Sequence, residues 1–239
     1  MRFNNQKLAS GTGVLVEHDS KFYLITAWHN LSGKHPETGQ CISKTVGIPN
    51  WVDIEAYCFK RSEPLFDRDN VPDDGFARFK THPEGSFIDI AALELGAYVA
   101  GASQLDGCFL DPVRNDRAMR LFVSQLCHII GFPEGLADRS YPNMPLALWK
   151  TGHIASEPES DFMGQPIVVV DARTRPGMSG SPVIVREFAI DGVTVVHNRL
   201  VGIYTGRFAT NDKEDSGLGR VVKPHVINET LSAFRRLPS

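Results

Sequence analysis

Ser179 stands in the run Gly177-Met178-Ser179-Gly180-Ser181-Pro182, which predicts a tight turn with glycine on both sides of the serine. A serine hydroxyl is a poor nucleophile until a neighbouring base takes its proton, so its surroundings decide whether it can react. Gly177 permits backbone angles that a side chain would oppose. The backbone N–H groups of Gly177 and Ser179 can then point into one small space, where they would stabilise a developing oxyanion. The turn therefore predicts a nucleophilic serine with an oxyanion hole.

A base, and an anchor for that base, occur upstream. His29 follows the apolar run Phe22-Tyr23-Leu24-Ile25-Thr26-Ala27-Trp28, which predicts a buried strand with the histidine at its end. Asp89 has two apolar residues on each side, and a buried carboxylate costs several kcal/mol unless it is paired or hydrogen-bonded. An imidazole N–H is a suitable partner, and the carboxylate would hold the ring in one tautomer. The three residues together predict acyl transfer by a triad.

Each of these residues also has an ordinary structural explanation. His29 could be satisfied by a backbone carbonyl inside a core. Asp89 could cap a turn or pair with Arg78, and Ser179 could hydrogen-bond within its own turn. The three residues occur in the order histidine, aspartate, serine, 60 and then 90 residues apart. That joint pattern favours the triad over three independent structural roles.

Three motifs resemble those of the trypsin-like serine peptidases. They are Thr-Ala-x-His at residues 26–29, Asp-Ile-Ala at 89–91 and Gly-x-Ser-Gly-x-Pro at 177–182. Further strands similar to those of the family are found at residues 11–16, 129–133, 151–156 and 200–204, and residues 171–177 are closest to the bacterial HtrA-like branch. The resemblance therefore covers almost the whole chain.

The resemblance implies an all-β fold, with two six-stranded antiparallel β-barrels of the chymotrypsin type and a short C-terminal α-helix. Residues 1–112 would form the barrel with His29 and Asp89, and residues 113–239 the barrel with Ser179. The last element, at about residues 224–236, has apolar residues at helical spacing and a proline suited to its first turn. The PDZ domain that often follows an HtrA-like protease is not expected.

The resemblance also implies roles for residues outside the triad. Thr205 would donate a hydrogen bond to Asp89, and Thr205, Gly206 and Arg207 would form the edge against which an extended substrate pairs. Arg173 falls at the base of the primary pocket, where an inward-facing arginine would favour an acidic substrate residue; facing solvent, it would have no such effect. Met178 replaces an aspartate that serves in activation by N-terminal cleavage, so any regulation would use another route, such as a protein partner.

Composition bounds the function classes. The chain has 239 residues, 42% of them hydrophobic, and a formal net charge of −3 with mixed signs, so no nucleic-acid partner is expected. No run of about 18 apolar residues predicts a membrane span, and no signal peptide precedes the first strand, which predicts a cytoplasmic protein. The spacing of the four cysteines and eight histidines predicts no zinc site, no other metal and no cofactor. Reduced thiols are the simplest account of the cysteines, with a Cys41–Cys58 bridge left open.

Two connections stand out between the predicted strands. Residues 61–75 are polar and rich in turn formers, which predicts a long exposed loop inserted in the first barrel. It would either gate the substrate or be a solvated insertion. Residues 110–117 predict the crossover between the barrels.

The predicted activity is that of a serine endopeptidase acting on a protein or peptide. Two alternatives use the same fold: a protease effector gated by a regulatory partner, and a binding module without turnover. A metallohydrolase is disfavoured, because no His-x-x-x-His spacing occurs.

Overall fold

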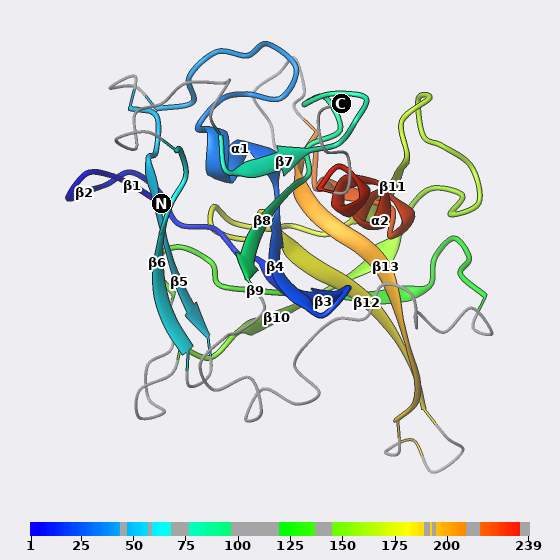
Figure 1. Ribbon diagram of the computed structural model, residues 1–239. Coiled ribbons are helices and arrows are strands. Elements are labelled where there is room, and N and C mark those ends of the chain that lie inside the picture. Colours follow the sequence, from blue (N-terminus) through cyan, green and yellow to red (C-terminus); the bar gives the residue numbers. More distant parts are fainter. Residues whose placement is uncertain are drawn as a thin grey trace.

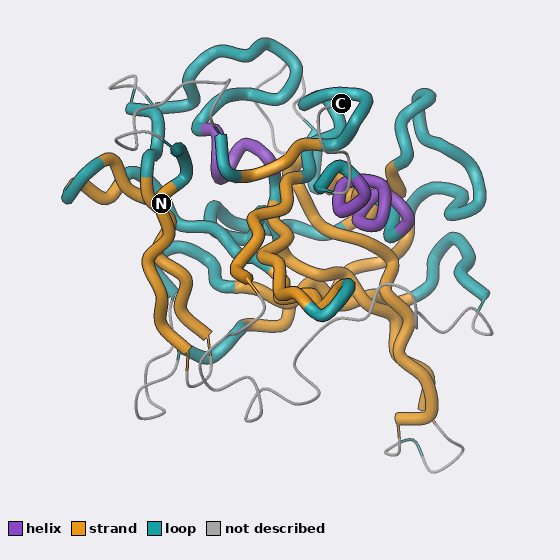
Figure 2. The backbone as a smooth tube through the Cα atoms, viewed as in Figure 1, coloured by secondary structure: helices purple, strands orange, loops and turns teal. Residues whose placement is uncertain are grey.

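β-Strands are the main secondary structure of the described chain, and they form three sheets (Figures 1 and 2). The computed structural model describes residues 1–43, 47–56, 59–67, 77–96, 120–136, 145–188, 192, 195–208 and 216–234. The strands of the N-terminal half are β1 (Arg2–Phe3), β2 (Gln6–Lys7), β3 (Val14–His18), β4 (Lys21–Thr26), β5 (Trp51–Ala56), β6 (Phe59–Pro64), β7 (Phe79–Thr81) and β8 (Ala91–Gly96). Those of the C-terminal half are β9 (Leu126–Gly131), β10 (Leu148–Ile154), β11 (Ile167–Asp171), β12 (Ser181–Phe188), β13 (Val195–Arg207) and β14 (Leu218–Val222). The helices are α1 (Trp28–Ser32) and α2 (His225–Ser232).

The sheet β3-β4-β8-β7 is buried on both of its faces, which explains the continuous apolar run in β4. Tyr23 and Ile25 point to one face, where they pack with residues of the C-terminal half and of α2. Leu24 and Leu93 point to the other face and pack with residues of β5 and α1. A strand that must be apolar on both sides shows no polar–apolar alternation.

The C-terminal half forms a closed six-stranded barrel in the order β10-β11-β14-β13-β12-β9. Its interior is apolar, with Ile129, Val183 and Val201 among the buried side chains, and Met178 of the serine turn joins this core. Leu200 and Ile203 of β13 instead point outward, toward the N-terminal half. The outer face of the barrel therefore forms the interface on which the two halves meet (Figure 1).

The second predicted barrel differs from the structure. In the described N-terminal residues, β2-β1-β5-β6 and β3-β4-β8-β7 are separate four-stranded sheets that enclose an apolar core. One isolated bridge, between Phe66 and Ala77, links them. The pairing does not extend there, because β7 has only three residues and β6 ends at Pro64, which has no N–H to donate. The prediction of one closed barrel in each half is thus met by the described residues in the C-terminal half alone.

The predicted exposed loop at residues 61–75 is wrong at its start. Residues 61–64 belong to β6, and Leu65 and Phe66 are buried in the N-terminal core. Glu63 is also buried, with its carboxylate held by the guanidinium groups of Arg61 and Arg78. A polar strand can be buried where its charges neutralise one another, and local composition does not reveal that pairing. Residues 68–75, the crossover at 110–117 and the boundary at 112–113 lie outside the described residues.

Three smaller expectations can be compared with the structure. Helix α2 starts directly after Pro224 and buries Val226, Ile227 and Leu231, as its pattern predicts. Cys41 is a free thiol, which excludes the Cys41–Cys58 bridge. None of the helices in the described ranges is long and apolar enough to cross a membrane.

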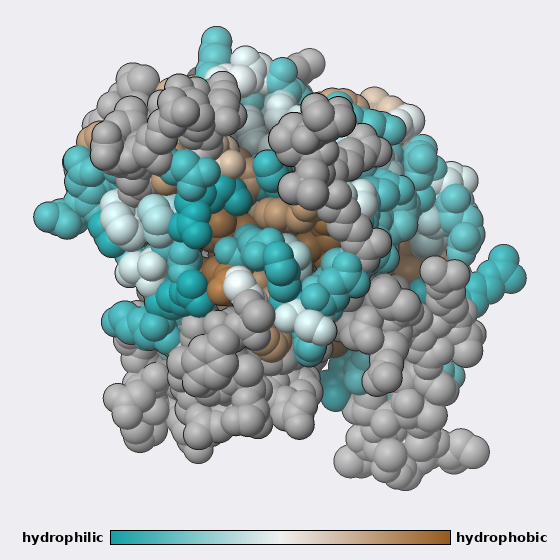
Figure 3. Space-filling model, in the orientation of Figure 1, coloured by the Kyte–Doolittle hydropathy of each residue, from teal (hydrophilic) through white to brown (hydrophobic). Residues whose placement is uncertain are grey.

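On the face of the molecule that is seen in Figure 3, apolar residues are visible near the centre, among hydrophilic ones.

Candidate active site

His29 lies on a short helix and not on a strand. Strand β4 ends at Thr26, and α1 begins two residues later at Trp28. Gly33 ends the helix in the left-handed region (φ 68°), and its N–H donates to the carbonyl of His29 at 3.0 Å. Trp28 and Leu31 pack into the N-terminal core, so the imidazole projects from a helix held by its neighbours.

Asp89 lies at the apex of a three-residue turn. The N–H of Ile90 donates to the carbonyl of Ile88 at 2.6 Å, a spacing that defines a γ-turn. Both isoleucines are buried in the interface between the halves, at 3% and 0% exposed. Because its neighbours are anchored on both sides, the carboxylate is presented in a fixed direction.

The carboxylate of Asp89 holds His29 through two hydrogen bonds. Oδ1 accepts from the backbone N–H of His29 at 3.0 Å, and Oδ2 lies 2.7 Å from the ring nitrogen Nδ1. The side chains are 10% and 19% exposed, so little water competes for these bonds. An ionised carboxylate only accepts, so Nδ1 carries a proton and Nε2 of the neutral ring keeps a free electron pair. That nitrogen is the one that can take a proton from another group.

Ser179 sits between two glycines whose backbone no other residue would adopt easily. Gly177 and Gly180 have φ of 91° and 92°. A Cβ on Gly180 would lie 1.9 Å from the carbonyl oxygen of Thr12, so the absence of a side chain lets the N-terminal half approach the serine turn. Met178, between Gly177 and the serine, is fully buried in the barrel. The turn therefore buries the side chain of Met178 and leaves that of Ser179 partly exposed.

The backbone N–H groups of Gly177 and Ser179 donate to no acceptor among the described residues. The carbonyl of Pro176 accepts from the N–H of Glu134 at 2.8 Å. In a planar trans peptide the carbonyl and the following N–H point in opposite directions, so the N–H of Gly177 points away from Glu134. This orientation leaves the N–H of Gly177 available to a bound anion, and the N–H of Ser179 is likewise without an acceptor among the described residues.

Two residues that the sequence interpretation did not single out tie the serine turn to the N-terminal half. The carbonyl of Ser179 accepts from the N–H of Thr12 and from Nδ2 of Asn30, each at 2.9 Å. The hydroxyl of Thr12 donates to the carbonyl of Gly177 at 2.8 Å and accepts from the N–H of Phe132 at 3.0 Å. Asn30 directly follows His29, so this bond couples α1 to the serine. The position of Thr12 between two glycines was the one local signal.

The structure brings Thr205 to the serine through its backbone. Ser179 Oγ donates to the carbonyl of Thr205 at 3.3 Å, and among the described residues it makes no hydrogen bond to His29. Thr205 is buried and lines the same recess as Asp89, but the described residues show no hydrogen bond between the two. Gly206 is half-buried, and the side chains of Arg173 and Arg207 are exposed. Arg173, the arginine predicted at the pocket base, is thus exposed in this structure.

The recess beside Asp89 lies between the two halves. Its other lining residues include Phe87, Gln165 and Arg220. Arg220 Nη1 donates to Glu37 Oε1 at 2.7 Å, and this hydrogen bond, with the charge of Arg220, lowers the pKa of the Glu37 carboxyl. Within the described residues, no three His, Cys, Asp or Glu side chains gather to hold a metal ion.

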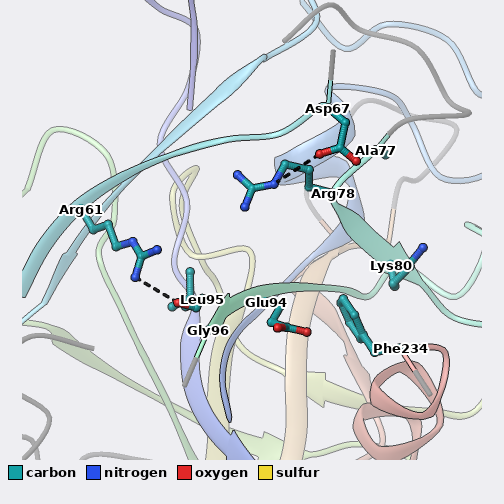
Figure 4. Close-up of a pocket in the computed structure, with 9 residues that line it drawn as sticks. All are labelled: Arg61, Asp67, Ala77, Arg78, Lys80, Glu94, Leu95, Gly96 and Phe234. Carbon is teal, nitrogen blue, oxygen red and sulfur yellow. Dashed lines mark hydrogen bonds and ion pairs between the residues drawn. The ribbon is translucent and has the colours of Figure 1, made fainter. Parts of the chain in front are cut away.

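A second, larger pocket of about 410 Å³ is lined by none of His29, Asp89 and Ser179. It lies between β6, β7, β8 and the end of α2 (Figure 4). Arg61 there donates to the carbonyl of Leu95 at 3.0 Å, and Arg78 lies 3.8 Å from Asp67. The two arginines also hold the buried Glu63. The charges that line this pocket thus stabilise the N-terminal half.

Residues 11–193 match the family described as the trypsin-like peptidase domain. The chain belongs to this family. The matched range contains His29, Asp89 and Ser179, and it confirms the resemblance drawn from the sequence motifs. No curated protein sequence matches the chain.

Solved structures of proteases share the fold. The HtrA-type protease AlgW with a decapeptide matches 97% of this chain with a TM-score of 0.55 and 16% identity. The Rv3671c protease of M. tuberculosis matches 95% in its active form, with a TM-score of 0.50 and 16% identity. This chain covers 74% of the Rv3671c chain and 53% of the AlgW chain, so it spans about half the length of the latter.

Proposed function

We propose that this protein is a serine endopeptidase in which Ser179 is the nucleophile, His29 the general base and Asp89 the residue that orients the base. The observation that carries the proposal is the pair of hydrogen bonds from His29 to the Asp89 carboxylate. A histidine held in this way keeps Nε2 unprotonated and faces one direction. Membership of the trypsin-like peptidase family supports the same reaction class.

In the first step, Ser179 Oγ attacks the carbonyl carbon of a peptide bond while Nε2 of His29 takes the hydroxyl proton. The electron pair of the carbonyl moves to its oxygen, and the resulting oxyanion accepts hydrogen bonds from the N–H groups of Gly177 and Ser179. The carboxylate of Asp89 stabilises the imidazolium, which then gives its proton to the leaving amine. Water, activated by the same histidine, hydrolyses the ester and restores the serine.

The hydroxyl of Ser179 must leave the carbonyl of Thr205 before it attacks. Its present bond to that carbonyl is long, at 3.3 Å, and catalytic hydrogen bonds often form only when substrate is bound. A substrate N–H that bonds the same carbonyl would displace the hydroxyl toward His29. We propose that residues 205–207 form the edge along which the substrate lies. We also propose that each half of the molecule acts as one barrel-like unit beside the recess next to Asp89.

The hydrogen bond from the Ser179 hydroxyl to the carbonyl of Thr205 also favours a second candidate function, a protease gated by a protein partner. In that case a regulator, and not substrate alone, would move the Ser179 hydroxyl from Thr205 to His29. His29, which would accept the proton, is already held by Asp89. Such a regulator would therefore act on the serine turn.

A biotinylated fluorophosphonate tests the nucleophile directly. We expect the wild-type chain to gain one label, and mass spectrometry of its peptides to find it on Ser179. Ser179→Ala should remove the label, and Asp89→Asn should slow casein hydrolysis by roughly 10⁴-fold, because the ring would lose its acceptor. Ser160→Ala, at an exposed serine, is the matched control and should label normally.

The outcomes separate the candidates. Labelling together with hydrolysis supports the free endopeptidase. Labelling so slow that it matches Ser160 and other surface serines would contradict it and favour the gated enzyme or a binding module. A folded Ser179→Ala variant that hydrolyses casein at the wild-type rate would overturn the assignment of the nucleophile.

A further inference from the structure

An open space lies above Gly206, one residue beyond the carbonyl that would hold the substrate. A Cβ on Gly206 would meet nothing within 4 Å. Gly206 pairs directly with Arg220 of β14 on the side of the strand away from the serine turn. Because directly opposed residues of an antiparallel pair project to the same face, the side chain of Arg220 lies on the face that Gly206 leaves empty.

Under the proposed function, on which this inference rests, a bound substrate would pair with β13 as an additional strand, on the side opposite to β14. The residue whose carbonyl is attacked bonds the carbonyl of Thr205 through its own N–H. In antiparallel pairing the residue before it then lies opposite Gly206. Strands are about 4.8 Å apart, so this preceding residue lies about 10 Å from the backbone of Arg220, with no side chain between them. Long side chains on both sides can meet over that distance.

Arg220 is equipped to bind an anion there. Its guanidinium stacks 4.6 Å from the centroid of the Phe208 ring, which fixes its plane. One nitrogen, Nη1, donates to Glu37, while Nε is buried and has no hydrogen-bond partner among the described residues. A guanidinium presents its donors in a rigid fork that suits carboxylates. Arg220 therefore has donors beyond those that Glu37 uses.

Glu37 occupies Arg220 as a substrate carboxylate would. It comes from the segment after α1, 183 residues away in sequence, and its side chain is 44% exposed while that of Arg220 is 27% exposed. An ion pair this exposed is weak, so it can exchange for another carboxylate. We propose that Arg220 selects substrates with Asp or Glu immediately before the cleaved residue, and that Glu37 is an internal competitor for the same guanidinium.

Paired peptides test this assignment. A peptide library first supplies a cleaved sequence, which is then made as two fluorogenic peptides that carry Glu or Gln before the cleaved residue. We expect wild-type kcat/KM to be about three-fold higher for Glu, within the range of a partly exposed ion pair. Glu37→Gln should raise this ratio further, to roughly five-fold, and Arg220→Gln should reduce it to about one.

Arg186→Gln is the matched control, because Arg186 stacks on Trp149 and Phe188 in the same manner but does not line the recess beside Asp89, as Arg220 does. It should keep the wild-type ratio. Fluorophosphonate labelling of each variant shows that its serine site has folded. A labelled, active enzyme whose ratio is one, or an Arg220→Gln variant that keeps the wild-type ratio, would overturn the role of Arg220 alone. An absence of both labelling and hydrolysis would overturn the proposed function, and the subsite with it.

Discussion

Thr12→Val removes a single hydroxyl that connects the serine turn to two other parts of the chain. The Thr12 hydroxyl donates to the carbonyl of Gly177 and accepts from the N–H of Phe132. These backbone groups have no other hydrogen-bond partner among the described residues. Thr12 itself is 5% exposed, so water cannot readily replace the hydroxyl. Valine has the same shape, which means that the variant tests the hydrogen bonds and not the packing.

The expected loss of stability follows from these two orphaned groups. A buried polar group without a partner costs about 1–3 kcal/mol, so with two such groups the free energy of unfolding should fall by roughly 2–6 kcal/mol. Since domains of this kind are stable by about 5–15 kcal/mol, the variant should fold but unfold at clearly lower urea concentration. Activity should fall as well, because the carbonyl of Gly177 belongs to the loop that would supply the proposed oxyanion hole. Loss of one oxyanion donor costs about 10²–10³ in kcat, and we expect a loosened donor to cost about ten- to a hundred-fold.

Urea denaturation followed by tryptophan fluorescence measures the first quantity, and peptide hydrolysis under saturating substrate the second. Thr12→Ser is the control, because it keeps the hydroxyl and removes only a methyl group. It should lie near the wild type in kcat and within about 1.5 kcal/mol in stability. Equal stability and equal kcat of the valine and serine variants would refute the reasoning. The two hydrogen bonds of the Thr12 hydroxyl would then contribute nothing to stability or to catalysis.

Three further predictions concern neighbouring features. Gly177→Ala should lower kcat by about 10²–10³, because φ is 91° and the added carbon would lie 2.5 Å from the carbonyl oxygen of Phe132; unchanged steady-state rates would contradict this. Burial raises the pKa of Cys127 to about 12, so iodoacetamide at about pH 8 should modify this thiol only in unfolded protein, as peptide mass spectrometry can check. Arg220 lowers the pKa of Glu37 in the folded state, so their ion pair stabilises above the unfolded pKa of about 4.3 and is lost as pH falls through the lower folded value. Glu37→Gln should therefore be less stable than wild type at neutral pH and equally stable in strong acid, and a gap that persists in acid would argue against the pair.

The local parts of the site were open to prediction from sequence. Gly177, two residues before Ser179, predicts a backbone that glycine alone adopts easily, and its φ of 91° agrees. The apolar neighbours of Asp89 predict a buried carboxylate in need of a partner, and His29 is hydrogen-bonded to it. Pro224 with the apolar spacing behind it predicts the start of α2. In each case the deciding interaction, or the need for one, lies within a few residues of the chain.

The parts that failed depend on distant partners. The run before His29 stays apolar through Trp28, so strand and helix have the same composition, and burial of Trp28 and Leu31 on one side of α1 decides for the helix. The charges of residues 61–64 favour an exposed loop until Arg78, from another strand, neutralises Glu63. Thr12 makes its decisive bond 165 residues away. No window of sequence contains such pairs.

The ties around Ser179 also bear on how the site can be controlled. Covalently the serine turn belongs to the C-terminal barrel, yet its own carbonyl is held by Thr12 and Asn30 of the N-terminal half. His29, the proposed base, and Asp89, which is hydrogen-bonded to it, come from that half alone. A shift of one half against the other would therefore leave the His29–Asp89 pair intact and disturb the serine turn and its N–H groups first. Regulation of this protein, if it acts on the interface, should thus appear as a change in kcat and in the rate of serine labelling, and not as loss of the histidine–carboxylate hydrogen bonds.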